Sequence, residues 1–182
     1  MYRGTNARAS LRLKTASVSA AAESETAPRI DVMAQWNTSL LRRQANLRLK
    51  VLASEITEAQ AQQAMQQSPQ FIIIQLYLIS NDRFLFRDAA ALEKGAQSDA
   101  YLLFPRSKVS LRPEKVEVIP SDSFEKPTVV RLSFLRARDG QPAVPAGEKN
   151  AKVGWKNMPG GFRDLEVQFD LEKLGSNPAT DF

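Results

Sequence analysis

The chain contains neither cysteine nor histidine. Without histidine it lacks the commonest general base, the usual side-chain ligand of transition metals and the base of a Ser-His-Asp triad. Without cysteine it has no disulfide and no thiolate nucleophile, and a zinc site, which almost always uses Cys or His, is not expected. No apolar run approaches the roughly 20 residues that a membrane-spanning helix needs. We therefore expect no cofactor or metal, no membrane span and no enzymatic activity.

Positive charge is concentrated at the front of the chain. Residues 1–50 hold nine Lys/Arg and three Asp/Glu, a balance of +6, whereas residues 51–182 hold sixteen and seventeen, a balance of −1. Residues 1–28 are rich in Ala, Ser, Thr and Arg. We interpret them as a basic, flexible N-terminal arm; a short strand near Leu11 and an organellar transit peptide are the alternatives. No secretory signal is visible.

The most apolar segment is Phe-Ile-Ile-Ile-Gln-Leu-Tyr-Leu-Ile at residues 71–79. Alternate residues of a strand face opposite sides, and both sides of this segment are apolar except for Gln75. The pattern predicts a strand in the middle of a sheet, covered on both faces. Asn81 and Asp82 suit a hairpin turn, so residues 83–87 are expected to return as an antiparallel strand.

Two or three short helices are expected between residues 38 and 95. In Thr38–Ala53 the apolar residues Leu41, Ala45, Leu49 and Leu52 recur at spacings of three or four, which predicts a helix. The last part of that segment, Asn46–Leu52, is equally compatible with a strand.

The next two helices are marked by their ends. Thr57 is a helix N-cap before a run of good helix formers, and Pro69 stops that run. Asp88 is expected to cap a short helical turn that Gly95 ends.

The rest of the domain alternates strands with turns. Strands are predicted at 29–36, 100–104, 109–111, 115–119, 128–136 and 164–174, with a turn at Asp139-Gly140 and a long loop over 141–152. This pattern predicts a mainly β (α+β) fold, an antiparallel β-sandwich-like domain over 29–174 with helical insertions. A five-stranded sheet with helices on one face is the alternative, and 175–182 is a polar tail.

Four segments carry a family resemblance: Val-Met-Ala-Gln-Trp at 32–36, Gln-Ser-Pro-Gln-Phe-Ile-Ile-Ile at 67–74, Leu-Leu-Phe-Pro-Arg at 102–106 and Leu-Glu-Val-Gln-Phe-Asp-Leu-Glu-Lys-Leu at 165–174. With them the chain resembles a family of uncharacterised bacterial proteins that are expected to be exported. The resemblance implies a periplasmic or secreted location. It brings no activity and assigns no residue a role.

The loop from Val153 to residue 163 is the most suggestive surface feature of the sequence. Its aromatic and basic residues could stack on and pair with a sugar, a base or the acidic loop of a partner protein. These residues are Trp155, Lys156, Phe162 and Arg163. The alternative is a hairpin loop whose Trp155 folds back over the edge of the sheet. Trp36 is expected in the core, and Arg106 is expected to pair with a buried acid.

Two other functions remain open. A nucleic acid would be bound, without sequence preference, through basic residues of the front region: Arg3, Arg8, Arg12, Lys14, Arg42, Arg43, Arg48 and Lys50. No aromatic residues that would stack bases are interleaved with them. Carboxylate catalysis would need a converging pair among Asp82, Asp88, Asp164 and Glu166. The sequence thus favours a non-enzymatic domain that binds another protein or itself, with nucleic-acid binding as the alternative.

Overall fold

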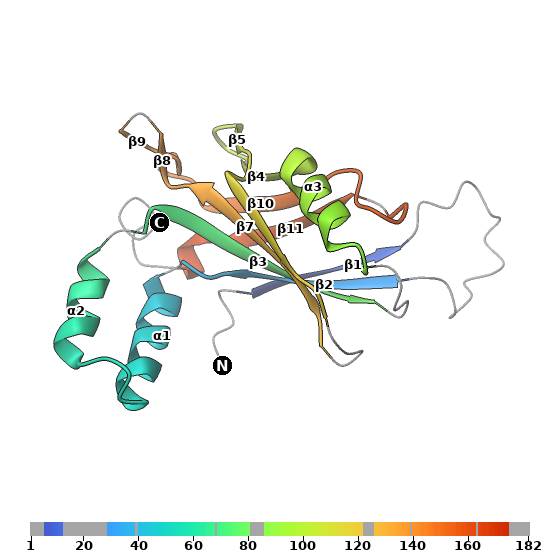
Figure 1. Cartoon of the computed structure of the whole chain (residues 1–182). Helices are drawn as coiled ribbons and strands as arrows, with labels where there is room; N and C mark the ends of the chain where they lie inside the picture. The colour runs from blue at the N-terminus through green and yellow to red at the C-terminus, as the bar shows by residue number, and fades with distance from the viewer. Residues whose placement is uncertain are drawn as a thin grey trace.

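The computed structural model of the protein describes residues 6–12, 29–38, 40–67, 69–80, 86–121, 126–138, 140–162 and 164–174. Within them the strands pair antiparallel and form a five-stranded sheet, a four-stranded sheet and a two-stranded ribbon. The two larger sheets lie face to face around one core (Figure 1). The predicted antiparallel, sandwich-like fold is confirmed.

The first sheet has the predicted apolar strand at its centre. Its strands follow the order β1 (Asn6–Arg12), β2 (Arg29–Trp36), β3 (Phe71–Ser80), β7 (Thr128–Leu135) and β6 (Lys115–Ile119). On the inner face of β3 every side chain from Ile72 to Leu78 is buried. The outer face is less well covered than expected, because Ile73 and Tyr77 are half-buried and Ile79 is 51% exposed.

The second sheet contains a strand that the sequence did not suggest. Its order is β11 (Leu165–Asp170), β10 (Asn150–Trp155), β4 (Ala100–Phe104) and β5 (Val109–Leu111). The prediction of a loop over 141–152 is therefore wrong at both ends: Gln141–Pro142 is a short strand, and β10 begins at Asn150. Gly154 weakens the strand pattern, and the ring of Tyr101 on neighbouring β4 occupies the space that a Cβ there would need. The ribbon β8 (Ala137–Arg138) and β9 (Gln141–Pro142) forms at the expected turn, where Gly140 has a φ of 75°.

Large apolar side chains join the two sheets. Trp36, at the end of β2, is fully buried and meets Phe169 of β11 edge to face, with ring centroids 5.4 Å apart. Trp155 of β10 is also fully buried. The prediction that Trp36 belongs to the core is confirmed.

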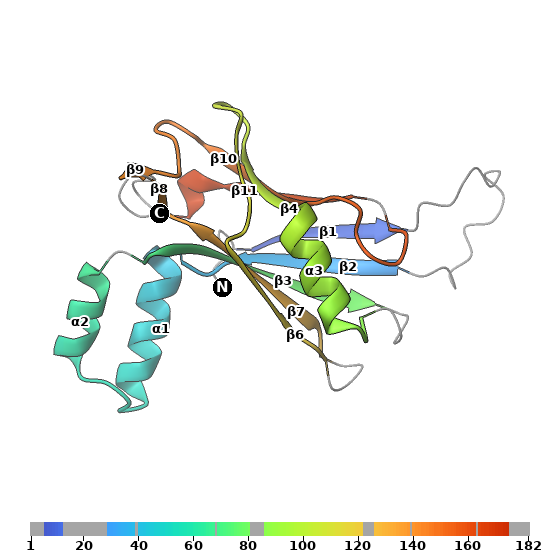
Figure 2. The same cartoon turned by 45° about the horizontal axis from the view of Figure 1, so that its top comes forward.

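The third helix, α3 (Ala89–Asp99), packs against β6 and β4 at one side of the sandwich (Figures 1 and 2). Asp88 caps it as predicted, accepting a hydrogen bond from the Ala91 N–H at 2.9 Å. Gly95 does not end the helix, because the apolar face continues through buried Ala96. A lone glycine costs a helix only about 1 kcal/mol.

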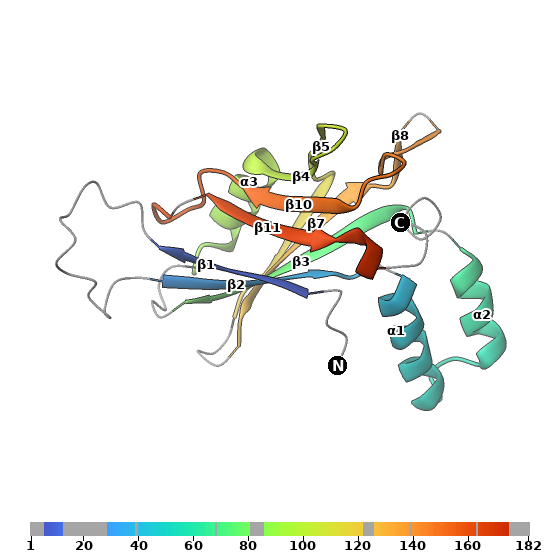
Figure 3. The same cartoon turned by 180° about the vertical axis from the view of Figure 1, so that it is seen from behind.

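On the other side of the sandwich, β1 lies next to β11 (Figure 3). Residues 6–12 were predicted within a flexible arm, with a short strand near Leu11 as the alternative, and they form this edge strand, which pairs with β2 in full register. The remaining residues of the predicted arm, 1–5 and 13–28, lie outside the described residues, as do the tail at 175–182 and the hairpin at 81–85. Phe86 and Arg87, expected in the returning strand, are not in a strand.

Two helices form a hairpin between β2 and β3. The helices α1 (Leu40–Leu52) and α2 (Glu58–Gln66) confirm both predictions and exclude a strand over 46–52. Thr57 forms a capping box with Gln60: its hydroxyl accepts from the Gln60 N–H, and the Gln60 side chain accepts from the Thr57 N–H.

At the other end of the chain β11 stops at Asp170, whose carboxylate caps the 3-10 turn η1 (Leu171–Lys173).

Candidate functional site

The aromatic residues of the expected partner-binding loop are in the core. Trp155 is 0% exposed and Phe162 1% exposed. Stacking on a partner needs exposed rings, so this part of the expected site is corrected: Trp155 ends strand β10, and its ring lies in the core between the sheets. Lys156 is exposed, with its Nζ 5.8 Å from the centroid of the Tyr101 ring. Arg163 lies outside the described residues.

The candidate carboxylates serve separate structural purposes. Asp88 caps α3, and Asp164 accepts a hydrogen bond from the Asn157 N–H at 3.2 Å. Glu166 pairs with Lys152 at 2.7 Å. No group of three Asp or Glu residues in the described part of the chain is arranged to hold a metal ion. Asp82 lies outside the described residues.

A small charged cluster covers the outer face of the second sheet. Burial raises the pKa of Tyr101, and the nearby negative charges of Glu166 and Asp164 raise it further. The hydrogen bond to Glu166 raises the pKa of Lys152. These shifts stabilise the neutral phenol and the charged ammonium, so neither group is prepared to act as a base near neutral pH.

Arg106 is bound to the loop that precedes β10. Its guanidinium donates to the Gly147 carbonyl at 2.9 Å, and its backbone N–H donates to the buried carboxylate of Glu148 at 3.3 Å. The Ser107 N–H donates to the other Glu148 oxygen at 2.5 Å. The expected pairing of Arg106 with a buried acid thus occurs mainly through the backbone.

The basic residues proposed for nucleic acid do not share one role. Arg8 is exposed on β1, and Arg42 donates to the Gln35 side chain at 3.2 Å. Arg43 is engaged inside the hairpin, where its guanidinium donates to the carbonyls of Ala64, at 2.9 Å, and Gln67. Arg3, Lys14 and the side chain of Arg12 lie outside the described residues.

The helical hairpin is the candidate functional site that the structure supports. It extends away from the end of the first sheet, and the separation persists when the molecule is turned (Figures 1 and 2). None of the described side chains in α1 or α2 is buried. Isolated helices of 13 and nine residues are marginal in water, so the hairpin depends on the contacts between its two helices.

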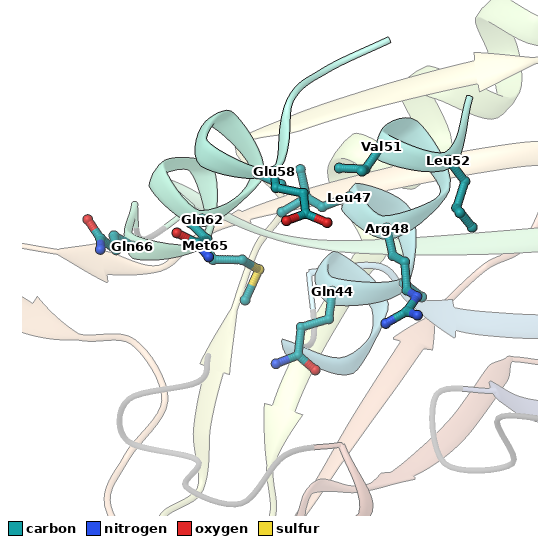
Figure 4. Close-up of a pocket in the computed structure, with 11 residues that line it drawn as sticks. Gln44, Leu47, Arg48, Val51, Leu52, Glu58, Gln62, Met65 and Gln66 are labelled. Carbon is teal, nitrogen blue, oxygen red and sulfur yellow. The ribbon is translucent and has the colours of Figure 1, made fainter. Parts of the chain in front are cut away.

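A groove of about 780 Å³ lies between the two helices. Its apolar lining comes from both helices, and Figure 4 shows Glu58 and Met65 of α2 pointing toward α1. The apolar lining residues are Ala45, Leu47, Val51, Leu52, Ala61 and Met65. Arg48, Gln44, Glu58, Gln62 and Gln66 supply the polar rim. This is the form of surface that receives the apolar face of a third helix.

The apolar stripe of α1 continues beyond the groove into solvent. Ala45, Leu49 and Leu52 share one side of the helix by their spacing. Leu49 is 64% exposed and Leu52 is 73% exposed. Sequence periodicity located this stripe but gave no indication that the sandwich leaves it uncovered. The absence of any acid in α1, which carries four basic residues, is the one sequence signal of an unusual surface.

No known protein family, curated protein or solved structure matches the chain. Among the described residues, no helix has the length and apolar character needed to span a membrane.

Proposed function

We propose that this protein is a non-enzymatic binding domain whose helical hairpin, α1 and α2, docks onto another protein. The observation that carries the proposal is the apolar stripe of α1, in which Leu49, beside the groove, and Leu52, which lines it, are both largely exposed. Large apolar side chains that adjoin one another on a surface mark an interaction site more often than scattered ones do.

The shape of this surface suits a protein partner better than it suits a flat lipid surface. The groove is lined from both sides, by Leu47 and Val51 of α1 and by Met65 of α2. A partner helix inserts side chains into such a groove at intervals of three and four residues. A lipid surface, by contrast, binds the exposed face of a single helix that lies in its plane.

The direct test is site-specific photo-crosslinking in source cells. A photoreactive residue in place of Leu52 is expected to give a discrete protein adduct. The matched control position is Glu93, which is exposed on α3 at a distance from the hairpin. The adduct at position 52 should disappear when Leu49→Glu is introduced as well. No protein adduct at position 52, or the same adducts at positions 52 and 93, would contradict the proposal.

The segments that resemble exported bacterial proteins extend the proposal to location: we propose that the domain works in the cell envelope or outside the cell. Fractionation of source cells with an antibody against the native protein tests this directly. Recovery with the envelope or in the medium supports it. Recovery with nucleic acid that moderate salt releases would instead favour binding through the basic front region.

A further inference from the structure

We infer that the partner of the hairpin is an acidic amphipathic helix that lies along α1 and fills the groove as the third helix of a bundle. The inference rests on the proposed function and names the chemistry of the partner. It is carried by the distribution of charge around the apolar stripe.

The charge on α1 is of one sign. The helix carries four basic residues and no acidic one. Arg43 is engaged with carbonyls of α2, and Arg42 with Gln35. Arg48 and Lys50 are exposed, and neither side chain forms an ion pair or hydrogen bond within the described residues. These two cations are therefore available to a partner.

Arg48 stands where it would meet a helix in the groove. It lines the groove itself and precedes Val51 and Leu52 by three and four residues, which places it beside them on the same side of α1. A partner that inserts apolar side chains here would bring its flanking residues opposite Arg48. Acidic residues at those positions would form ion pairs, whereas basic ones would be repelled.

A second copy of this chain suits the surface less well. Packing two α1 stripes together would place Arg48 and Lys50 of each copy near the same cations of the other. The hairpin supplies only two acids against this charge, Glu55 and Glu58, and Glu58 is directed toward α1 of its own hairpin (Figure 4). Charge complementarity therefore favours a different, acidic partner.

The test measures binding of the full chain to labelled designed peptides by fluorescence anisotropy. One peptide has Leu at every third or fourth position with Glu at the flanking positions. The control peptide has Lys in place of each Glu. We expect the Glu peptide to bind about tenfold or more tightly than the Lys peptide, with a preference that weakens as salt is added.

Charge reversal makes the test specific. The double variant R48E/K50E is expected to reverse the preference, so that the Lys peptide binds more tightly. The variant L49E/L52E should lose both peptides. Because all four side chains are exposed, neither variant is expected to unfold the protein, and circular dichroism checks this.

Binding of a different partner in the groove would give results that contradict the inference. Equal binding of the two peptides, or a preference that R48E/K50E leaves unchanged, would overturn the inference. So would a dimer in sedimentation equilibrium that L49E/L52E dissociates, or tighter binding to phosphatidylserine vesicles than to the Glu peptide. A protein adduct at position 52 without binding of the Glu peptide would overturn this inference and leave the proposed function standing.

Discussion

Glu148 is a buried carboxylate that joins two loops. It is 3% exposed, and each of its oxygens accepts one backbone N–H, from Arg106 and from Ser107. Burial by itself raises the pKa of Glu148, but the hydrogen bonds from Ser107 and Arg106 and the charge of Arg106 outweigh it and hold that pKa below the usual 4.5. The carboxylate therefore stabilises the turn after β4 against the loop before β10.

The substitution Glu148→Gln should lower the free energy of unfolding at neutral pH by about 1–3 kcal/mol. The new amide group would place its NH₂ against one of the two N–H donors and leave that donor unpaired. Urea denaturation measures the effect.

The same effect has a defined pH dependence. Because the folded-state pKa is depressed, the contribution of Glu148 is present above pH 4.5 and is lost as the pH falls through the folded-state pKa. The difference in the free energy of unfolding between the wild type and Glu148→Gln should therefore become smaller in acid. Glu172→Gln is the control, since the exposed carboxylate of Glu172 forms a surface ion pair with Lys149. A difference in the free energy of unfolding that is independent of pH, or an equal loss of stability in both variants, would contradict this account.

At the scale of elements, local signals predicted the helices and most strands. Thr57 and Asp88 form the caps expected of them, and the alternation in 165–170 matches the burial of β11. The strand β10 was missed because its pattern is short, contains Gly154 and depends on the Tyr101 ring of a neighbouring strand. Pairing between distant segments supplies that information, and a single strand's pattern does not contain it.

The candidate site was less predictable than the fold. The composition of the loop around Trp155 suggested an exposed aromatic cluster, yet the core requires these rings. The stripe of α1 was visible in the spacing of Leu49 and Leu52, but amphipathicity shows only that a helix has an apolar face. Whether that face meets the sandwich or solvent depends on where the hairpin leaves the sheet, which the three-dimensional structure determines.

The connection between α1 and α2 leads to a prediction about the hairpin alone. Arg43 donates from α1 to carbonyls in the last turn of α2. Arg43→Ala should increase hydrogen exchange of the α2 amides by about tenfold or more, because a charged hydrogen bond is lost there. Amides of β3 should be unaffected.

The matched control for Arg43→Ala is Lys50→Ala. It removes a cation of the same helix that has no partner among the described residues. Faster exchange in both variants, or in β3 as well, would show that Arg43 does not hold the hairpin together in this way.

At the scale of the whole molecule, the sandwich and the hairpin are separable. The two sheets form a continuous core that reaches from Ile30 to Leu174, and none of the α1 and α2 side chains that the structure describes belongs to it. The strands on either side of the hairpin already meet: Trp36 pairs with Ile74, and the Asn37 N–H donates to the Ile73 carbonyl at 2.8 Å. The hairpin is thus an insertion at the point where β2 could turn directly into β3.

Replacing residues 39–69 with a short Asn-Gly turn should therefore leave the sandwich folded. Shortening the connection reduces the entropic cost of loop closure, and none of the described core side chains lies in the replaced segment, so the free energy of unfolding should change by no more than about 1 kcal/mol. Near-ultraviolet circular dichroism of Trp36 and Trp155 should be retained, because both residues lie in the sandwich core. Binding of the Glu peptide should be abolished. If the variant without the hairpin unfolds, the hairpin supports the core. If the variant still binds the peptide, the docking surface lies elsewhere on the sandwich.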